Sequence, residues 1–223
     1  MKGEPRFCLW LREAPPAVLR HPLVRSKLEK VAAHRAGSPR LDVRAKAATP
    51  YLFEYDTQPS ARFIAFPEVS SERRTYIPIR FLEASDIVTN KIIVVPTDSI
   101  LHFGVLTSAM FMAWVRAVAG RLKSDLSPSP ETVFNTFPYP DLSSSRSERI
   151  SQAAAGILEA RAAHPNWTLA DLYDPVSMPV DLVRAHTRLD SAFGRQRQVS
   201  DASRLMVLFQ RYGELVGASK PPR

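Results

Sequence analysis

The sequence has 223 residues, enough for one large domain or two ordinary ones, and its 45% hydrophobic and 23% charged residues exclude an intrinsically disordered chain. A net charge of +8 and an isoelectric point of about 9.9 favour a polyanionic partner such as nucleic acid, although charge alone leaves an acidic membrane surface or a merely basic protein open. The single cysteine, Cys8, excludes an internal disulfide framework and a multi-cysteine zinc site.

The N-terminal part predicts a strand, a helix and a basic connector. The apolar run 6–11 predicts the strand, in which Cys8 would be a buried structural thiol rather than a nucleophile. Residues 15–35 predict the helix, with Pro22 either dividing it or setting a later start. Residues 37–46 follow as the connector. The predicted outer face of the helix is basic and consists of Arg20, Arg25, Lys27, Lys30 and Arg35.

Residues 51–95 alternate short apolar runs with polar turns, a pattern typical of a β-rich unit. The expected strands cover residues 62–66, 75–81 and 92–95. In the turn at 70–74, Arg73 and Arg74 are candidates for contact with phosphate, since arginines in loops are common donors to a nucleic-acid backbone. The alternative is a structural ion pair between Glu72 and Arg73.

A single apolar helix is predicted over residues 101–119, and because it is apolar on most faces it should be buried. Its aromatic residues Phe103, Phe111 and Trp114 are therefore expected in the core. Gly120 is expected to end the helix, since glycine tolerates the left-handed conformation common there.

A short polar run, residues 121–127, follows the apolar helix. Residues 132–137 then predict a strand that Pro138 and Pro140 stop. A buried helix that presents polar residues from a rigid base is typical of a recognition element rather than of a catalytic one.

After Pro140 the composition changes to a serine-rich linker at 141–147 and then to three helical patterns, at 147–163, 179–193 and 200–215. Ser200 and Asp201 are suited to begin the last helix. The fold class is therefore α+β, with a β-rich domain at 1–140 that contains a long buried helix and a small all-α domain at 141–223. Phe137 and Tyr139 are expected to pack between the two domains, and Trp167 to anchor the helical one.

Motifs for catalysis are absent from the sequence. It contains no Gly-x-Gly turn for a nucleotide-like cofactor, no Asn/Asp-Pro-Pro-Tyr loop for a flipped base, and no nuclease pattern. The five histidines lack the spacing of metal ligands, and His102 and His186 are expected to be structural. We therefore expect no catalytic residue, cofactor site or metal site in this chain. With no signal peptide and no apolar run long enough to cross a bilayer, a cytoplasmic location is expected.

Collinear motifs along the chain carry a family resemblance. They are Ser108-x-Met110-x-Met112-Ala113-Trp114-x-Arg116, the run Gly120-Arg121-Leu122-Lys123-Ser124-Asp125, the run Asn135-Thr136-Phe137-Pro138-Tyr139-Pro140, and the blocks 6–11, 48–50, 67–79, 172–174, 178–179 and 185–190. In this order they resemble the target-recognition region of MmeI-like type IIL restriction–modification enzymes. Phe111 departs from the family pattern, which has histidine there, but its place in a helix leaves the fold expectation unchanged.

The resemblance implies a function for the whole chain. It implies a DNA-recognition segment that follows an adenine-N6 DNA methyltransferase domain, with or without an endonuclease, so that catalysis and S-adenosylmethionine binding lie outside residues 1–223. Expected partners are double-stranded DNA, read in the major groove, and that methyltransferase domain, with no membrane partner. Alternatives are a protein-interaction module and a specificity subunit of a multi-subunit restriction system. The latter usually carries two recognition units, whereas this chain has no internal repeat.

The resemblance also implies that base choice depends on Lys91, Lys123, Asp125 and Ser127. A lysine ammonium can donate to the two acceptors of guanine, and a carboxylate can accept from the amino group of cytosine. In an extended segment Lys123 and Asp125 would project to one side and could straddle one G·C pair; the alternative is a solvated surface ion pair. Lys91 with Ser127 is a second candidate pair that also favours guanine. Arg121 is expected either to hold phosphate or to pack against the helix.

Overall fold

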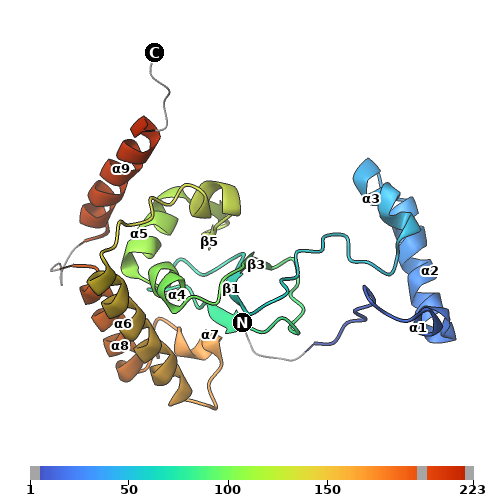
Figure 1. Ribbon diagram of the computed structural model, residues 1–223, viewed down its shortest axis with the longest axis horizontal. Helices are drawn as coiled ribbons and strands as arrows, with labels where there is room; N and C mark the ends of the chain where they lie inside the picture. Colours follow the sequence, from blue (N-terminus) through green and yellow to red (C-terminus); the bar gives the residue numbers. More distant parts are fainter. Residues whose placement is uncertain (1–5, 195–199, 219–223) are drawn as a thin grey trace. The chain divides into compact units, whose positions relative to one another are not determined.

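The computed structural model describes residues 6–194 and 200–218, and the chain divides into two compact units at Gln58 and Pro59 (Figure 1). The smaller, N-terminal unit is helical, with α1 (Pro16–Arg20), α2 (Pro22–Ala36), α3 (Leu41–Ala45) and the short 3-10 helix η1 (Lys46–Ala48). Pro22 divides the predicted helix, which confirms one of the two expected outcomes, because proline cannot donate its backbone nitrogen to a continuing helix. The predicted connector at 37–46 instead contains α3.

The predicted strand at residues 6–11 is wrong. These residues adopt no regular structure, and the described part of the N-terminal unit contains no strand with which they could pair. Cys8 is consequently exposed, and the expectation of a buried thiol is wrong as well.

Arg35 is buried instead of lying on the outer face of its helix. Its guanidinium donates to the backbone carbonyls of Lys46 at 3.0 Å, Thr49 at 3.1 Å and Leu52 at 2.8 Å. Few apolar side chains are buried in this unit, and α2 has no apolar face. The hydrogen bonds of Arg35, rather than hydrophobic packing, therefore hold α2 against the segment after α3.

The larger unit contains a three-stranded antiparallel sheet in the order β2–β1–β3. Its strands are β1 (Phe63–Pro67), β2 (Arg80–Leu82) and β3 (Ile92–Val95). All five residues of the central strand β1 are buried. The strand predicted at 75–81 is mostly wrong: only its last two residues belong to β2, although Ile77 and Ile79 are buried as their apolar character requires.

The predicted helix at 101–119 is two helices, α4 (Ile100–Leu106) and α5 (Ala109–Val118), with axes bent by 52°. Ser108 breaks the run because its hydroxyl donates to the carbonyl of Val105 and accepts from the backbone N–H of Phe111, which caps the second helix. Gly120 does not end the helix in a left-handed conformation as expected: Ala119 is already extended, and Gly120 begins a strand.

No single helix in the described part of the chain is long and apolar enough to cross a membrane. The bent pair α4–α5 would suffice by length and composition alone. Its apolar residues, Phe103 and Phe111 among them, are buried inside the larger unit, as those of a core helix are.

A hairpin and a short wide helix follow α5. The hairpin consists of β4 (Gly120–Leu122) and β5 (Asp125–Ser127), and the helix is η2 (Pro130–Phe134), which has π geometry. The predicted strand at 132–137 is therefore wrong. Pro130 supplies a first-turn residue, and the side chain of Ser129 accepts from the N–H of Thr132, so local capping overrides the β-branched composition.

The three predicted C-terminal helices are observed close to their predicted bounds, as α6 (Ser144–Ala162), α8 (Val180–Ala192) and α9 (Asp201–Ala218). The four-residue α7 (Leu169–Leu172) was not predicted. Ser200 accepts from the N–H of Ser203 and so caps α9 as expected. Figure 1 shows α6 and α8 side by side, with α4 against α6. The fold class is α+β, as predicted.

One hydrophobic core extends across the larger unit on both sides of residue 140. It joins Ile64 and Phe66 of the sheet to Trp114 of α5 and to Ile150 and Leu182 of the C-terminal helices. In this unit residues 59–140 and the C-terminal helices are packed on each other. A domain boundary at residue 140 therefore stays a prediction.

A buried polar cluster connects α8 to the segment before β2. The ring of His186 stacks on Tyr76 with centroids 3.9 Å apart, and its Nε2 lies 2.8 Å from the hydroxyl of Tyr173. Asp190 accepts from the hydroxyl of Tyr76 and from the backbone N–H of Ala109, both at 2.7 Å. Burial raises the pKa of Asp190 and that of Tyr76. His186 is therefore structural, as expected.

A close approach of α4 and α6 yields a stability prediction. A Cβ atom on Gly104 would lie 3.0 Å from side-chain atoms of both Ala154 and Ile150. Gly104→Val should therefore overpack the crossing and lower the free energy of unfolding by about 1–3 kcal/mol. In the interior of α6, Gly156 has open space around it, so Gly156→Ala should raise stability by up to about 1 kcal/mol. Urea unfolding of both variants measures the contrast, and equal effects of the same sign would contradict it.

Candidate nucleic-acid interface

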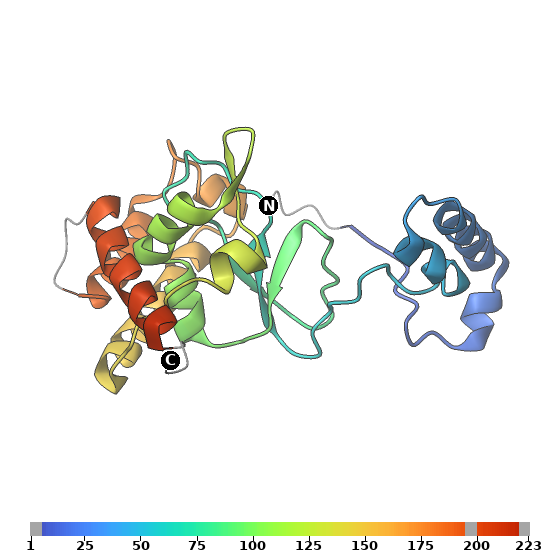
Figure 2. The same cartoon turned by 90° about the horizontal axis from the view of Figure 1, so that it is seen from above.

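The hairpin β4–β5 projects from a buried anchor. Leu126 is fully buried in the core of the larger unit, whereas every residue from Gly120 to Ser124 is exposed. In Figure 2 this yellow-green hairpin extends from the larger unit. Its base is thus fixed by hydrophobic packing while its tip is accessible to a partner.

The strand register places the hairpin side chains on two faces. Leu122 is paired with Asp125, and Gly120 with Ser127, so these four residues share one face. We call this face, together with the turn residue Lys123, the reading face. The other face carries the remaining pair, Arg121 with the buried Leu126. Because Gly120 has no side chain, Ser127 has no cross-strand side chain opposite it on the reading face.

Lys123 does not have the conformation expected for it. It is the first residue of the two-residue hairpin turn and has a φ of +58°, alone among the described non-glycine residues in having a positive φ. Alternation along an extended segment therefore does not place it beside Asp125, and the expected geometry of that pair is wrong. Asp125 instead shares its face with Ser127. A lysine in a left-handed turn carries strain of the kind that clusters at functional sites.

Lys91 is connected to the same hairpin through the segment after β1. Glu68 donates its backbone N–H to the carbonyl of Lys91 at 2.9 Å and pairs its carboxylate with the ammonium at 2.9 Å. Two residues later, the backbone of Ser70 exchanges two hydrogen bonds with Leu126, both 2.9 Å. The backbone segment 68–70 thus contacts both Lys91 and the strand β5, which carries Asp125 and Ser127.

The loop at 70–75 lies between this hairpin and α5. Glu72 pairs with Arg121, so the alternative of a Glu72–Arg73 ion pair is wrong. Arg116 donates to the carbonyls of Arg74 and Thr75, both at 3.2 Å. Arg73 is exposed. The pKa of Asp174 is lowered, first by a hydrogen bond from the backbone N–H of Val176 and also, to a smaller extent, by the charge of Arg73.

The aromatic residues divide as predicted where the core is concerned. Phe103, Phe111 and Trp114 are all buried, and the indole of Trp114 donates to the carbonyl of Val133 at 3.2 Å. Phe137 packs on Phe111 with ring centroids 5.0 Å apart. Trp167 is 43% exposed and contacts His164, which does not suit the anchoring role expected for it.

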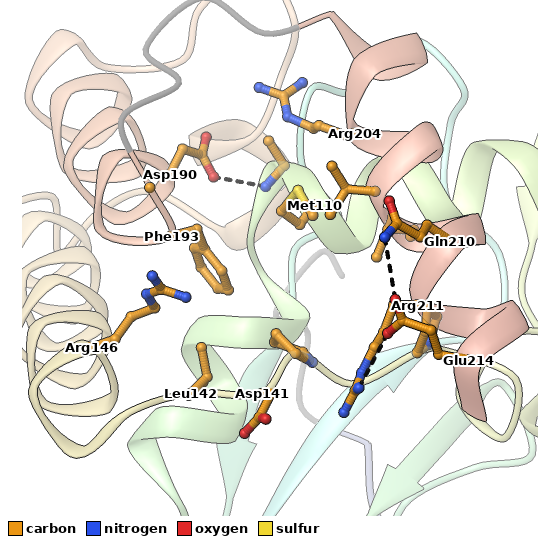
Figure 3. A pocket seen from close by; sticks show the side chains of 16 residues that line it. Met110, Asp141, Leu142, Arg146, Asp190, Phe193, Arg204, Gln210, Arg211 and Glu214 are labelled. Carbon is orange, nitrogen blue, oxygen red and sulfur yellow. Dashed lines mark hydrogen bonds and ion pairs between the residues drawn. The ribbon is translucent and has the colours of Figure 1, made fainter. Parts of the chain in front are cut away.

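A cavity of about 500 Å³ lies away from the hairpin, between the start of α5, the end of α8 and α9 (Figure 3). No residue predicted to contact DNA lines it. Its walls combine apolar residues such as Met110 and Phe193 with the charged side chains of Arg146, Arg204 and Glu214. Among the described residues no group of three or more His, Cys, Asp or Glu side chains is placed to hold a metal ion.

Two family descriptions together match nearly the whole chain. Residues 1–141 match the family described as the MmeI target recognition domain, and residues 142–218 match the MmeI C-terminal domain. The chain belongs to the MmeI family. The two matches meet beside Pro140, where the composition of the sequence also changes.

Two relatives of this MmeI-family chain extend the comparison. It is 39% identical over 221 residues to "DNA methyltransferase A" of Bacillus subtilis (strain 168), a match that covers 96% of this chain and 25% of that protein. It is also similar, at 38% identity and a TM-score of 0.90, to the type IIL restriction–modification enzyme MmeI solved in complex with DNA, over 94% of this chain and 29% of MmeI. The chain thus spans about a quarter of the length of these relatives.

The sequence patterns did not identify two candidate functional residues of this MmeI-family chain, Leu122 and Glu72. Leu122 is 58% exposed on the reading face, directly across from Asp125. Its position within the polar run was a signal, because an exposed leucine between two cations has no obvious packing role. Glu72 contacts Arg121 across 49 residues, and no local pattern could have predicted that contact.

Proposed function

We propose that this chain recognises a specific sequence in duplex DNA, with the reading face of the β4–β5 hairpin contacting base edges in the major groove. The observation that carries the proposal is the similarity over 94% of the chain to MmeI, which was solved in complex with DNA. The exposed tip on a buried base supports it, since base contacts need side chains that are accessible and held in place.

The side chains available at this face suit the major groove. Lys123 and Lys91 can each donate to the N7 and O6 acceptors of guanine, and Asp125 can accept from the amino group of cytosine. Ser127 can donate or accept. Leu122 offers an apolar contact for the methyl group of thymine. In this proposal Lys91 exchanges its ion pair with Glu68 for a base contact.

Contacts with the DNA backbone would supply affinity without sequence preference. The net charge of +8 favours a polyanion, and each phosphate neutralised adds to the salt dependence of binding. We assign this role to Arg73 and Arg74, which lie in the loop beside the hairpin. Arg73 is the stronger candidate because its side chain is exposed.

Catalysis belongs to a part of the parent protein outside these residues. We propose that the chain follows an adenine-N6 DNA methyltransferase domain that binds S-adenosylmethionine, packs against this segment and acts in the cytoplasm. The relative described as a DNA methyltransferase is four times as long as the matched segment, which leaves room for such a domain. The lack of a recognised catalytic motif in residues 1–223 is consistent with this division of labour.

Selection of duplexes from a random pool by the full-length parent protein tests the proposal. We expect one short motif to be enriched, and sequencing of methylated adenines in modified DNA should return the same motif. Enrichment without any shared motif, together with methylation independent of sequence, would overturn it. Retention of an acidic protein partner but of no duplex would favour the protein-interaction alternative.

A further inference from the structure

The guanidinium of Arg121 contacts three separate segments of the larger unit. Nη1 donates to the carbonyl of Ser124 at 3.2 Å and lies 3.5 Å from Oε2 of Glu72, and Nη2 lies 3.5 Å from the carbonyl of Arg116. Ser124 is the second turn residue of the hairpin, Glu72 belongs to the loop at 70–75, and Arg116 is in the last turn of α5.

These contacts form at a hairpin turn, in a loop and at the C-terminal turn of a helix. The last carbonyls of a helix lack intrahelical partners, and a cation there is favoured by the helix dipole. The guanidinium is planar and offers several donors in a fixed arrangement, so one side chain can serve acceptors on three segments. A lysine ammonium is a single point charge on a flexible stem and cannot reproduce this set.

The strand register separates Arg121 from the reading face. Arg121 is paired with the buried Leu126 and lies on the opposite face from Leu122, Asp125 and Ser127. Within the hairpin it thus faces away from the side on which base edges would be contacted. Its contact with Ser124 instead closes the turn in which Lys123 takes its left-handed conformation.

We propose that Arg121 and Glu72 are positioning residues that hold the hairpin turn, and with it Lys123 and Asp125, in the geometry required for base discrimination. The proposal rests on the proposed DNA recognition, and of the two roles expected for Arg121 it adopts packing against the helix rather than a phosphate contact. Glu72 orients the guanidinium, and the backbone bonds of Ser70 to Leu126 hold the base of the same hairpin.

The decisive test compares Arg121→Lys and Glu72→Gln in the full-length parent protein. Methylation rates are measured on the selected site and on sites with a single change at the base pair assigned to Asp125. Both variants should lose discrimination at that pair by about tenfold, within the range that a bidentate base contact provides. For Arg121→Lys, affinity for a non-cognate duplex and its salt dependence should stay unchanged. The double variant should lose no more discrimination than Arg121→Lys alone, because Glu72 acts only through its contact with Arg121.

A phosphate contact would produce a different pattern. In that case Arg121→Lys would keep its discrimination, and Glu72→Gln would strengthen binding to every duplex without any loss of discrimination. Either result overturns the proposal. The matched control is the exposed ion pair of Arg62 with Glu83, whose variants Arg62→Lys and Glu83→Gln should leave discrimination unchanged.

Failure of the underlying function would be visible in the unsubstituted protein. If the parent protein shows no preference among duplexes, DNA sequence recognition itself is wrong. If it shows a clear preference that Arg121→Lys and Glu72→Gln both retain, only the positioning role is wrong. Exposed ion pairs contribute little to stability, so thermal unfolding midpoints of the variants should match that of the parent and exclude loss of the fold.

Discussion

The double substitution Lys123→Glu and Asp125→Arg in the full-length parent protein should convert one recognised base pair from G·C to C·G. Lys123 lies in the hairpin turn and Asp125 begins the strand after it, so both can still reach one base pair although strand alternation does not align them. The exchange moves the donor and the acceptor to opposite sides of the pair, so that arginine can donate to guanine on the other strand and glutamate can accept from cytosine. Each contact discriminates by about 1–3 kcal/mol, so methylation of the original site should fall by roughly two orders of magnitude. Mapping of methylated adenines measures the change of motif.

A matched charge exchange separates recognition from general electrostatics. Arg25 and Glu29 form an exposed ion pair on α2, 2.9 Å apart, and Arg25→Glu with Glu29→Arg keeps the net charge in the same way. This control should leave the methylated motif unchanged. A hairpin variant that still methylates the original site at the original rate would return Lys123 and Asp125 to the role of solvated surface residues.

Acid should destabilise the larger unit through His186. Burial lowers the pKa of this imidazole from 6.5 to about 3, and the nearby charge of Arg161 adds to the shift, while the backbone at Thr107 opposes it. The unfolded chain therefore binds a proton near pH 6.5 that the folded protein does not bind. The stability contribution is complete above pH 6.5 and is lost as the pH falls toward 3.

The expected loss from His186 between pH 7.5 and pH 4.5 is about 3 kcal/mol of unfolding free energy. Its neighbour Asp190 acts in the opposite sense, because its raised pKa makes the folded state more favourable as the pH falls. His186→Gln removes the titrating ring and should flatten the pH dependence by that amount, even if it lowers stability at pH 7.5. Urea unfolding at both pH values measures it.

The exposed His34 provides the control for this experiment. His34→Gln on α2 substitutes a histidine of the N-terminal unit, so it should leave the pH dependence of unfolding of the larger unit as it is in the unsubstituted chain. An unchanged slope for His186→Gln would show that protonation of other groups governs acid unfolding.

Several local structures could be predicted because their causes are local. The C-terminal helices follow their apolar spacing and their capping residues, and β3 was predicted with its observed bounds because an apolar β-branched run lies between polar turns. Phe103, Phe111 and Trp114 are buried because a helix apolar on most faces must be covered. In these cases the sequence pattern and the tertiary environment favour the same structure.

The errors occurred where a contact distant in sequence or a capping group overrode the pattern. Ser108 divides the predicted helix, and the N-terminus of its second half receives the carboxylate of Asp190, which is 81 residues away. Arg35 lies in a basic helix that predicts exposure, yet three carbonyls beyond α3 hold it inside. Periodicity reports which face is apolar and cannot report such partners.

By itself the sequence determined the α+β class, the net positive charge, the burial of the aromatic residues in the apolar helices and the resemblance to the MmeI family. These properties depend only on composition, apolar spacing and collinear motifs, which are local to the chain. Only the tertiary structure decided how the candidate site is assembled. Strand pairing separates the reading face of the hairpin from the face that carries Arg121 and Leu126. The turn gives Lys123 a φ of +58°, and the loop at 70–75 brings Glu72 to Arg121. The hairpin register depends on which backbone groups pair, which apolar spacing does not specify, and the contact of Glu72 with Arg121 joins residues 49 positions apart.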